Sequence, residues 1–434
     1  RLTSSLPFGK RRLLTVRLRA RIARLLNPKI YSLCNFKERF GELIMKMKAI
    51  FFVVSALALF VMTACKDPSD GTGSGTGTLP EAPFVEGGVS FILSPDKLDI
   101  GITVTSADGS DVTVEGCEET TLTSDTEAEL HAQGTRITLK GNITELKCDN
   151  NQLISLNVQG LTALKSLECF NNLLTALNVQ DLPALQELEC RNNQLIALNL
   201  RGMTALQGLW CGGNKLAALD VRDLRALQTL RCNDNLFTEL DVHGLTALQN
   251  LSCKNNQLAA LNVQGCTALE ELECDANQLT ELKVQGLRAL QTLRCYDNRL
   301  TSLDVHGLRA LKDLECNDNL LTALNAQGCT ALEKLHCRKN QLTVLNVQGC
   351  TALKGLDCLI NKLDAQAFTK LFSDLPARTG YAYCYLYTEE KGVSEGNCKD
   401  FTNPPDLKAA FEKAKTEKKW TLQKYVGNGV WTEI

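Results

Sequence analysis

Cysteine is the residue type in this chain with the most chemistry open to it, because a thiolate can ligate zinc, form a disulfide or act as a nucleophile. The 434 residues include 19 cysteines. Eleven of them recur without a gap at the spacing that separates residue 148 from residue 169. This cysteine ladder consists of Cys148, Cys169, Cys190, Cys211, Cys232, Cys253, Cys274, Cys295, Cys316, Cys337 and Cys358. A fixed period indicates repeated structure, so the thiols have to be interpreted within the repeat.

Leucine and asparagine follow the same 21-residue period. Leucine stands two residues before each ladder cysteine, from Leu146 to Leu356, and asparagine stands three residues after it, from Asn151 to Asn361. The Leu-x-Cys step alternates inward and outward as a short strand does, so stacked units predict a parallel sheet, about 50 Å long at a strand spacing of about 4.8 Å. We expect the asparagine amides to satisfy backbone groups where each coil turns.

The unit LxxLxCxxNxLxxL resembles the bacterial leucine-rich repeat, and its cysteine in place of a core leucine is similar to the cysteine-ladder internalins. The resemblance covers roughly residues 136–363. It implies an α/β solenoid, a right-handed leucine-rich-repeat coil with a parallel β-sheet on its concave face. It also implies a bacterial surface protein that binds other molecules in adhesion.

The thiols of the ladder are interpreted as core filling, since a buried free cysteine behaves as a small hydrophobic residue. A linear stack cannot place four thiolates tetrahedrally around one zinc ion, and parallel neighbours seldom offer disulfide torsions. Cys266, Cys329 and Cys350 stand where other repeats have leucine or methionine, so they too are expected in the core. Cys384 and Cys398 lie outside the repeat and could close a loop worth about 3 kcal/mol in an exported protein. Bridged and free forms of this pair both stay open.

The first methionine, Met45, precedes two lysines and an apolar run from Ala49 to Met62 that ends at Cys65. This is the layout of a signal peptide. It resembles the lipobox of bacterial lipoproteins, in which Cys65 would carry the lipid of an outer-membrane lipoprotein displayed at the cell surface. An ordinary signal peptide or a short membrane anchor is the alternative.

The chain therefore divides into six predicted parts. Residues 1–44 are interpreted as an upstream translation artefact, 45–64 as the signal peptide, and 65–83 as the lipidated cysteine and a flexible tether. Alternating apolar residues over 84–135 predict a β-rich N-terminal cap. The repeats follow over 136–363, and helical and strand patterns over 364–434 predict a small α/β C-terminal cap.

Residues that flank the inward positions point out of the predicted sheet, and they vary from repeat to repeat. Constant inward and varied outward residues are what a recognition surface needs, and outward aromatic and arginine side chains resemble interface anchors. The candidate ligand-binding residues on the concave face are Phe170, Trp210, Arg231, Arg294, Tyr296 and His336. The expected partner is a protein or glycoprotein on a host or neighbouring bacterial surface, with membrane contact through a lipid anchor only. A net charge of -2 and mixed surface charge argue against nucleic acid.

Catalysis is not expected. The four histidines include His243 and His306, which share a repeat phase but lie three units, about 14 Å, apart, too far to chelate one ion. No nucleophile has a base at a recognisable spacing, and neither a cofactor nor a small-molecule substrate is predicted. We therefore predict an adhesin for host adhesion or biofilm formation. The alternatives are a structural envelope or matrix component without a discrete ligand, and a catalytic C-terminal cap.

Overall fold

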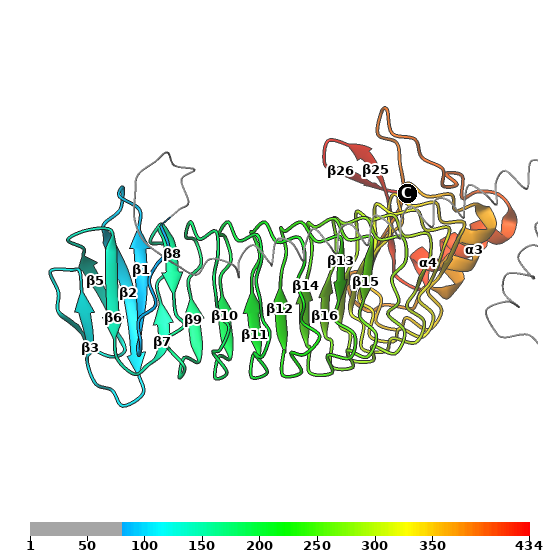
Figure 1. The fold of residues 1–434 in the computed structure, drawn as a ribbon. Helices are drawn as coiled ribbons and strands as arrows, with labels where there is room; N and C mark the ends of the chain where they lie inside the picture. Colours follow the sequence, from blue (N-terminus) through cyan, green and yellow to red (C-terminus); the bar gives the residue numbers. More distant parts are fainter. Residues whose placement is uncertain (1–79) are drawn as a thin grey trace, which may run out of the picture. The chain divides into compact units, whose positions relative to one another are not determined.

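The computed structural model describes residues 80–434 (Figure 1). The predicted upstream segment, the signal peptide, Cys65 and all of the tether before residue 80 lie outside the described residues. Within residues 80–434, no helix combines the length and the apolar character that crossing a membrane requires.

The repeats stack into one large parallel sheet, visible as the row of short arrows in Figure 1. Equivalent residues of successive repeats pair in register, as Leu188 does with Leu209. The repeat strands are β7 (Ile143–Lys147), β9 (Ser166–Glu168), β10 (Glu187–Glu189), β11 (Gly208–Trp210), β12 (Thr229–Arg231), β14 (Asn250–Ser252), β16 (Glu271–Glu273), β17 (Thr292–Arg294), β19 (Asp313–Glu315), β21 (Lys334–His336) and β23 (Gly355–Asp357). The predicted leucine-rich-repeat solenoid is confirmed.

The ladder leucines and cysteines form the interior of the coil. Leu209 and Cys211 are fully buried, and so is every other ladder cysteine. Cys266, Cys329 and Cys350 are buried as well, and their thiols donate to backbone carbonyls of the preceding repeat, as Cys266 Sγ does to Val242 O at 3.1 Å. Because neighbouring repeats share this interior, each coil is covered by the next.

The ladder asparagines fasten each turn to the coil before it. Asn172 Nδ2 donates to the carbonyls of Cys148 and Cys169 at 3.0 and 3.1 Å, and its Oδ1 accepts from Leu153 N at 2.9 Å. The residue before it, Asn171, has a φ of 53°, which opens the turn that these bonds close. The amide thus satisfies buried backbone groups from two repeats at once.

A second set of short parallel strands runs on the other side of the coil, and the sequence did not predict it. There β13 (Glu239–Asp241) pairs with β15 (Ala260–Asn262), and β18 (Leu303–Asp304), β20 (Ala323–Asn325) and β22 (Val344–Asn346) form a three-stranded sheet. Each contains one inward leucine between exposed or half-buried neighbours, too short a pattern to distinguish from a turn.

The N-terminal cap is built of β strands, several of which pair with the first repeats. Its elements are β1 (Gly88–Leu93), β2 (Asp99–Ser106), β3 (Val112–Glu115), β4 (Thr121–Leu122) and β5 (Thr126–His131). Two strands from the predicted repeat region, β6 (Arg136–Lys140) and β8 (Leu153–Asn157), pair with β1 and so join the cap to the coil. Strand β2 pairs with β7 and so extends the large sheet. Its Gly101 exchanges two hydrogen bonds with the side chain of Asn151, at 2.7 and 3.1 Å. The cap therefore supplies the contacts that a preceding repeat would give.

The C-terminal cap combines helices and strands. It contains α3 (Ala365–Asp374), β24 (Tyr383–Thr388), α4 (Pro405–Thr416), β25 (Thr421–Gly427) and β26 (Val430–Glu433). Strands β24 and β25 continue the parallel sheet beyond β23, and β26 closes it antiparallel. Phe372 of α3 and Phe411 of α4 pack edge to face at 5.6 Å, so the helices bury each other beside the last coil.

Of the bridged and free forms of Cys384 and Cys398 that the sequence leaves open, the structure has the free form. Both are free thiols. Cys384 is fully buried and takes the place of a ladder leucine, in register with Leu356. Cys398 is half-buried, pairs through its backbone N with Leu363 O and donates its thiol to Asp400 O at 3.2 Å. The thiol of Cys384 therefore lies in the core, and that of Cys398 lies at a surface turn.

Candidate ligand-binding face

The outward residues of the large sheet form one continuous surface, called here the sheet face. It consists of the residues three and one before each ladder cysteine and the residue one after it. On β11 these are Gly208, Trp210 and Gly212, with Leu209 and Cys211 buried between them. The inward residues are the same in every repeat and the outward residues vary. The sheet face is therefore the surface on which the repeats differ from one another.

The six predicted residues all lie on the sheet face but do not form one cluster. Trp210 and Arg231 are register partners on neighbouring strands β11 and β12, and they line the same pocket. The other four take part in separate local contacts. These residues are Phe170, Arg294, Tyr296 and His336.

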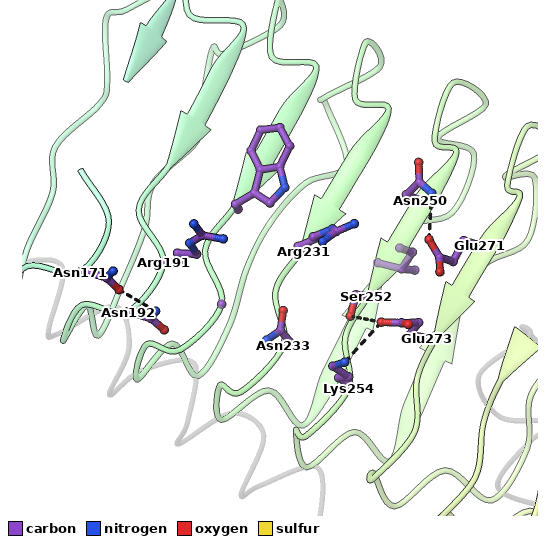
Figure 2. A pocket seen from close by; sticks show the side chains of 13 residues that line it. Asn171, Arg191, Asn192, Arg231, Asn233, Asn250, Ser252, Lys254, Glu271 and Glu273 are labelled. Atoms are coloured by element: carbon purple, nitrogen blue, oxygen red, sulfur yellow. Dashed lines mark hydrogen bonds and ion pairs between the residues drawn. The ribbon is translucent and has the colours of Figure 1, made fainter. Parts of the chain in front are cut away.

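A pocket of about 480 Å³ opens on the sheet face between β10 and β16 (Figure 2). Figure 2 shows Arg191 and Arg231 in one part of it and Glu271 and Glu273 in another. Apart from Trp210, a stretch of Leu251 and a glycine, its lining consists of amides, one hydroxyl, cations and carboxylates. The pocket is therefore suited to a polar ligand with one apolar face.

Trp210 is positioned by Gly208. A Cβ atom added at Gly208 would collide with ring carbons Cζ3 and Cη2 of Trp210 and with a carboxylate oxygen of Glu187. The indole therefore lies against bare backbone on one side, and its other side lines the pocket. Gly212 similarly leaves room for the amide of Asn233, which a Cβ there would meet at 2.9 Å.

The cations of the pocket differ in what already neutralises them. Arg191 pairs with Glu189 at 2.8 Å and lies over the Phe170 ring at 4.5 Å. Lys254 lies 3.6 Å from Glu273. Arg231 is exposed and has no ion-pair partner among residues 80–434. Its guanidinium is therefore the cation with the most capacity for a ligand anion.

Side-chain hydrogen bonds hold the rim of the pocket in place. Asn192 Nδ2 donates to Asn171 Oδ1 at 2.7 Å, and Ser252 Oγ donates to Glu273 at 3.0 Å, both drawn in Figure 2. Asn250 donates to Glu271 at 3.2 Å. These bonds link side chains one repeat apart, so the rim is ordered before any ligand arrives.

Arg294, one of the predicted binding residues, is already neutralised by carboxylates. Its guanidinium lies 2.6 Å from Glu273 and 3.3 Å from Glu315. Burial alone would raise the pKa of Glu273, but the hydrogen bond from Arg294 and the charge of Lys254 bring that pKa below its ordinary value. Arg294 thus orders the acidic side of the pocket instead of offering a free charge.

Tyr296 and His336 also have carboxylates as neighbours. Burial and the Asp275 carboxylate raise the pKa of Tyr296 to about 12, so the phenol stays protonated at neutral pH. His336 Nδ1 lies 4.0 Å from Asp357, a carboxylate that is almost fully buried. Burial raises the pKa of Asp357.

Sequence reasoning missed two features of this face. The row three residues before each cysteine contributes Glu187, whose Oε2 is buried without a hydrogen-bond partner among the described residues, and burial raises the pKa of this carboxyl. The 21-residue period could have shown that Glu187 faces outward, because it stands three residues before Cys190. The C-terminal cap adds Tyr383 and Tyr385 to the same face, with Trp431 stacked on Tyr385 at 3.7 Å. The three rings pack against one another, so they fill the sheet face over the C-terminal cap.

The ladder thiols are unreactive because they are buried. Burial raises the pKa of Cys211 and that of Cys316 to about 12. Among residues 80–434 there is no group of three or more potential ligands arranged to hold a metal ion.

Comparison with solved structures returns a protein with the same row of thiols. It is the functional domain of InlJ from Listeria monocytogenes, which includes a cysteine ladder; the match has 34% identity and a TM-score of 0.49, and covers 51% of this chain and 50% of that one. The chain resembles the cysteine-ladder internalins. It spans half of that internalin, so nothing about the partners of the whole protein passes to this chain from the match.

Other matches in the same comparison are more distant. An internalin, inlF, from Listeria monocytogenes shares 20% identity over 56% of this chain and 80% of its own, with a TM-score of 0.41. A leucine-rich-repeat protein from Leptospira interrogans shares 20% over 63% of this chain and 82% of its own, with a TM-score of 0.42. No protein-family model matches the chain, and no curated protein does.

Proposed function

We propose that this chain is a surface adhesin that binds a protein or glycoprotein through the sheet face, in attachment to host cells or to neighbouring bacteria. The observation that carries the proposal is the contrast within the repeat. Leucine, cysteine and asparagine are constant, and all of them but the half-buried Asn256 are buried, while the outward rows vary along the stack and surround an ordered pocket. Such a scaffold varies its surface without disturbing its core.

The proposal is one of binding and not of catalysis. The carboxylates nearest the pocket are engaged, Glu273 by Arg294, Lys254 and Ser252 and Glu271 by Asn250 and Arg294. Engaged carboxylates are poor general bases because their proton affinity is lowered or their lone pairs are occupied. Anchoring through a lipid on Cys65 is part of the same proposal and rests on the sequence alone.

Adherence of cells that display the protein tests this function. We expect the triple variant Phe170→Ala, Trp210→Ala and Tyr296→Ala to adhere at least about tenfold less at equal surface amount, since aromatic anchors carry most interface energy. The matched control replaces three exposed apolar residues outside the sheet face, Ile196, Leu236 and Val344, by alanine.

Two results would count against the proposal. If a folded triple variant adheres like the control, the sheet face is not the binding surface. If the unaltered protein shows no saturable partner in host or bacterial surface fractions, it is a passive envelope component. Protease shaving of intact cells and replacement of Cys65 by serine test surface display and the anchor separately.

A further inference from the structure

We infer that the pocket around Trp210 binds an anionic saccharide, with a sugar ring stacked on the indole and an acidic substituent held by Arg231. This inference rests on the proposed function and specifies the ligand class for the central pocket of the sheet face.

The first support is the indole of Trp210, which is half-buried and lines the pocket. Trp210 lies against the backbone of Gly208, and two further glycines, Gly212 and Gly213, follow on the same coil. In no other repeat is either of the two residues that follow the ladder cysteine a glycine. Three residues of the coil near the indole of Trp210 therefore have no side chain. An indole presents a polarised, electron-rich face, which suits the C–H face of a pyranose ring.

The second support is the position of a free guanidinium. Arg231 is the register partner of Trp210 on the next strand, so its side chain starts one strand spacing from the indole. Arg191 and Lys254 add positive charge on either side, although each already has a carboxylate neighbour. A guanidinium fork matches the geometry of a carboxylate or a sulfate-type anion. An acidic group attached to a stacked ring therefore finds its partner.

The third support is the rest of the pocket lining. Asn192 and Asn233 offer amides at the end of the pocket shown in the lower part of Figure 2, and Ser252 offers a hydroxyl. The hot-spot side chains of protein partners are mostly Trp, Tyr and Arg, held in well-packed and fully desolvated pockets. Besides one flat ring, Leu251 and a glycine, this lining offers amide, hydroxyl and charged groups, so it fits a hydroxyl-rich ring better than a large apolar side chain.

Isothermal titration calorimetry of the full chain tests the inference with defined probes. The anionic probes are sialyllactose, trigalacturonate and a sulfated chondroitin disaccharide, which distinguish carboxylate from sulfate. Lactose is the neutral control and triglutamate the acidic peptide control. We expect at least one anionic sugar to bind at least about tenfold more tightly than lactose and triglutamate, and to bind more weakly as salt is raised.

Three variants and one control variant locate the site. Trp210→Ala and Arg231→Ala are each expected to weaken binding of the anionic sugar by about tenfold or more, whereas Arg309→Ala, an exposed arginine outside the pocket, leaves it unchanged. Gly208→Ala displaces the ring without removing any ligand-binding group and is expected to weaken lactose and anionic sugar alike. Equal melting temperatures of the Arg231→Ala and Arg309→Ala variants show that the loss is not one of folding.

Several outcomes would overturn the inference: no binding of any saccharide, equal affinity for neutral and anionic sugars, tighter binding of triglutamate, or binding that survives Trp210→Ala. In each case adherence that still depends on the sheet face leaves the proposed function standing. Loss of saturable binding to every surface fraction would instead remove the proposed function itself.

Discussion

At the scale of single residues, the constant asparagine and the constant cysteine of the repeat have different roles. The ladder asparagine makes directed bonds, since Asn277 Nδ2 donates to the carbonyls of Cys253, Cys274 and Asp275 and its Oδ1 accepts from Leu258 N. The ladder cysteine fills a small space among leucines and makes few directed bonds. Hydrogen bonding therefore fixes the first residue type, and volume fixes the second.

Replacing a ladder asparagine is expected to destabilise the protein. Asn277→Ala leaves Leu258 N and several carbonyls without their partner in a buried turn, which costs about 3 kcal/mol. Urea unfolding followed by circular dichroism measures the loss, and Gln278→Ala at the next, exposed position is the control. Equal midpoints for the two variants would show that the asparagine amide does not hold the turn.

The ladder thiols are expected to resist alkylation in the folded protein. Only the thiolate reacts, and burial raises the pKa of Cys211 to about 12, so at pH 8 about one thiol in ten thousand would be ionised even if reagent reached it. Peptide mapping after iodoacetamide should find Cys398, which is half-buried, labelled far ahead of the ladder. Raising the pH toward 12 increases the ionised fraction. Ladder peptides that label as fast as Cys398 at pH 8 would contradict the buried interior.

What the sequence predicts at this scale is the side of the sheet on which a residue lies. The period alone placed Trp210 and Arg231 outward and Cys211 inward, because alternation follows from strand geometry. It could not show that Arg294 is neutralised by Glu273 and Glu315, since those partners lie a full repeat away on each side and depend on rotamers. Nor could the period show that the indole of Trp210 lies against Gly208.

At the scale of elements, the caps cover the two ends of the coil by making the hydrogen bonds that a neighbouring repeat would make. Asn151 bonds to Gly101 of β2 where a preceding coil is missing. At the other end Asn397 Nδ2 donates to Cys358 O at 2.8 Å, and its Oδ1 accepts from Leu363 N at 2.9 Å, as a ladder asparagine does. The sequence predicted that caps exist and their rough composition. It could not identify Asn397, which lies off the 21-residue period.

Helix α3 of the C-terminal cap depends on its first residue. Asp364 accepts a hydrogen bond from Ala367 N at 2.8 Å and so caps the helix. Asp364→Ala is expected to cost about 1 kcal/mol and to speed amide hydrogen exchange over residues 365–374. Asp364→Asn keeps an acceptor at the same atom and is expected to behave like the unaltered protein. Unchanged exchange in the alanine variant would mean that packing alone holds α3.

At the scale of the whole described unit, every repeat contacts its two neighbours, and the stack is one-dimensional in its energetics. The sequence predicted this architecture well because one unit, once interpreted, is repeated along most of the chain. The binding function cannot be predicted from the repeat in the same way. It depends on the few places where repeats differ, and there a single chain offers no repetition from which to infer.

Removing one whole repeat tests both statements. Deletion of residues 317–337 joins Cys316 to Arg338 in phase and should leave a folded protein whose sheet is one strand, about 4.8 Å, shorter by small-angle scattering. Its binding through the pocket should persist, because that pocket lies between β10 and β16. Deletion of residues 212–232 has the same length and phase but removes Arg231 and the second side of the Trp210 pocket, so it should fold and lose binding. If both deletions unfold the chain, the repeats are not interchangeable units; if both bind equally, the ligand lies elsewhere.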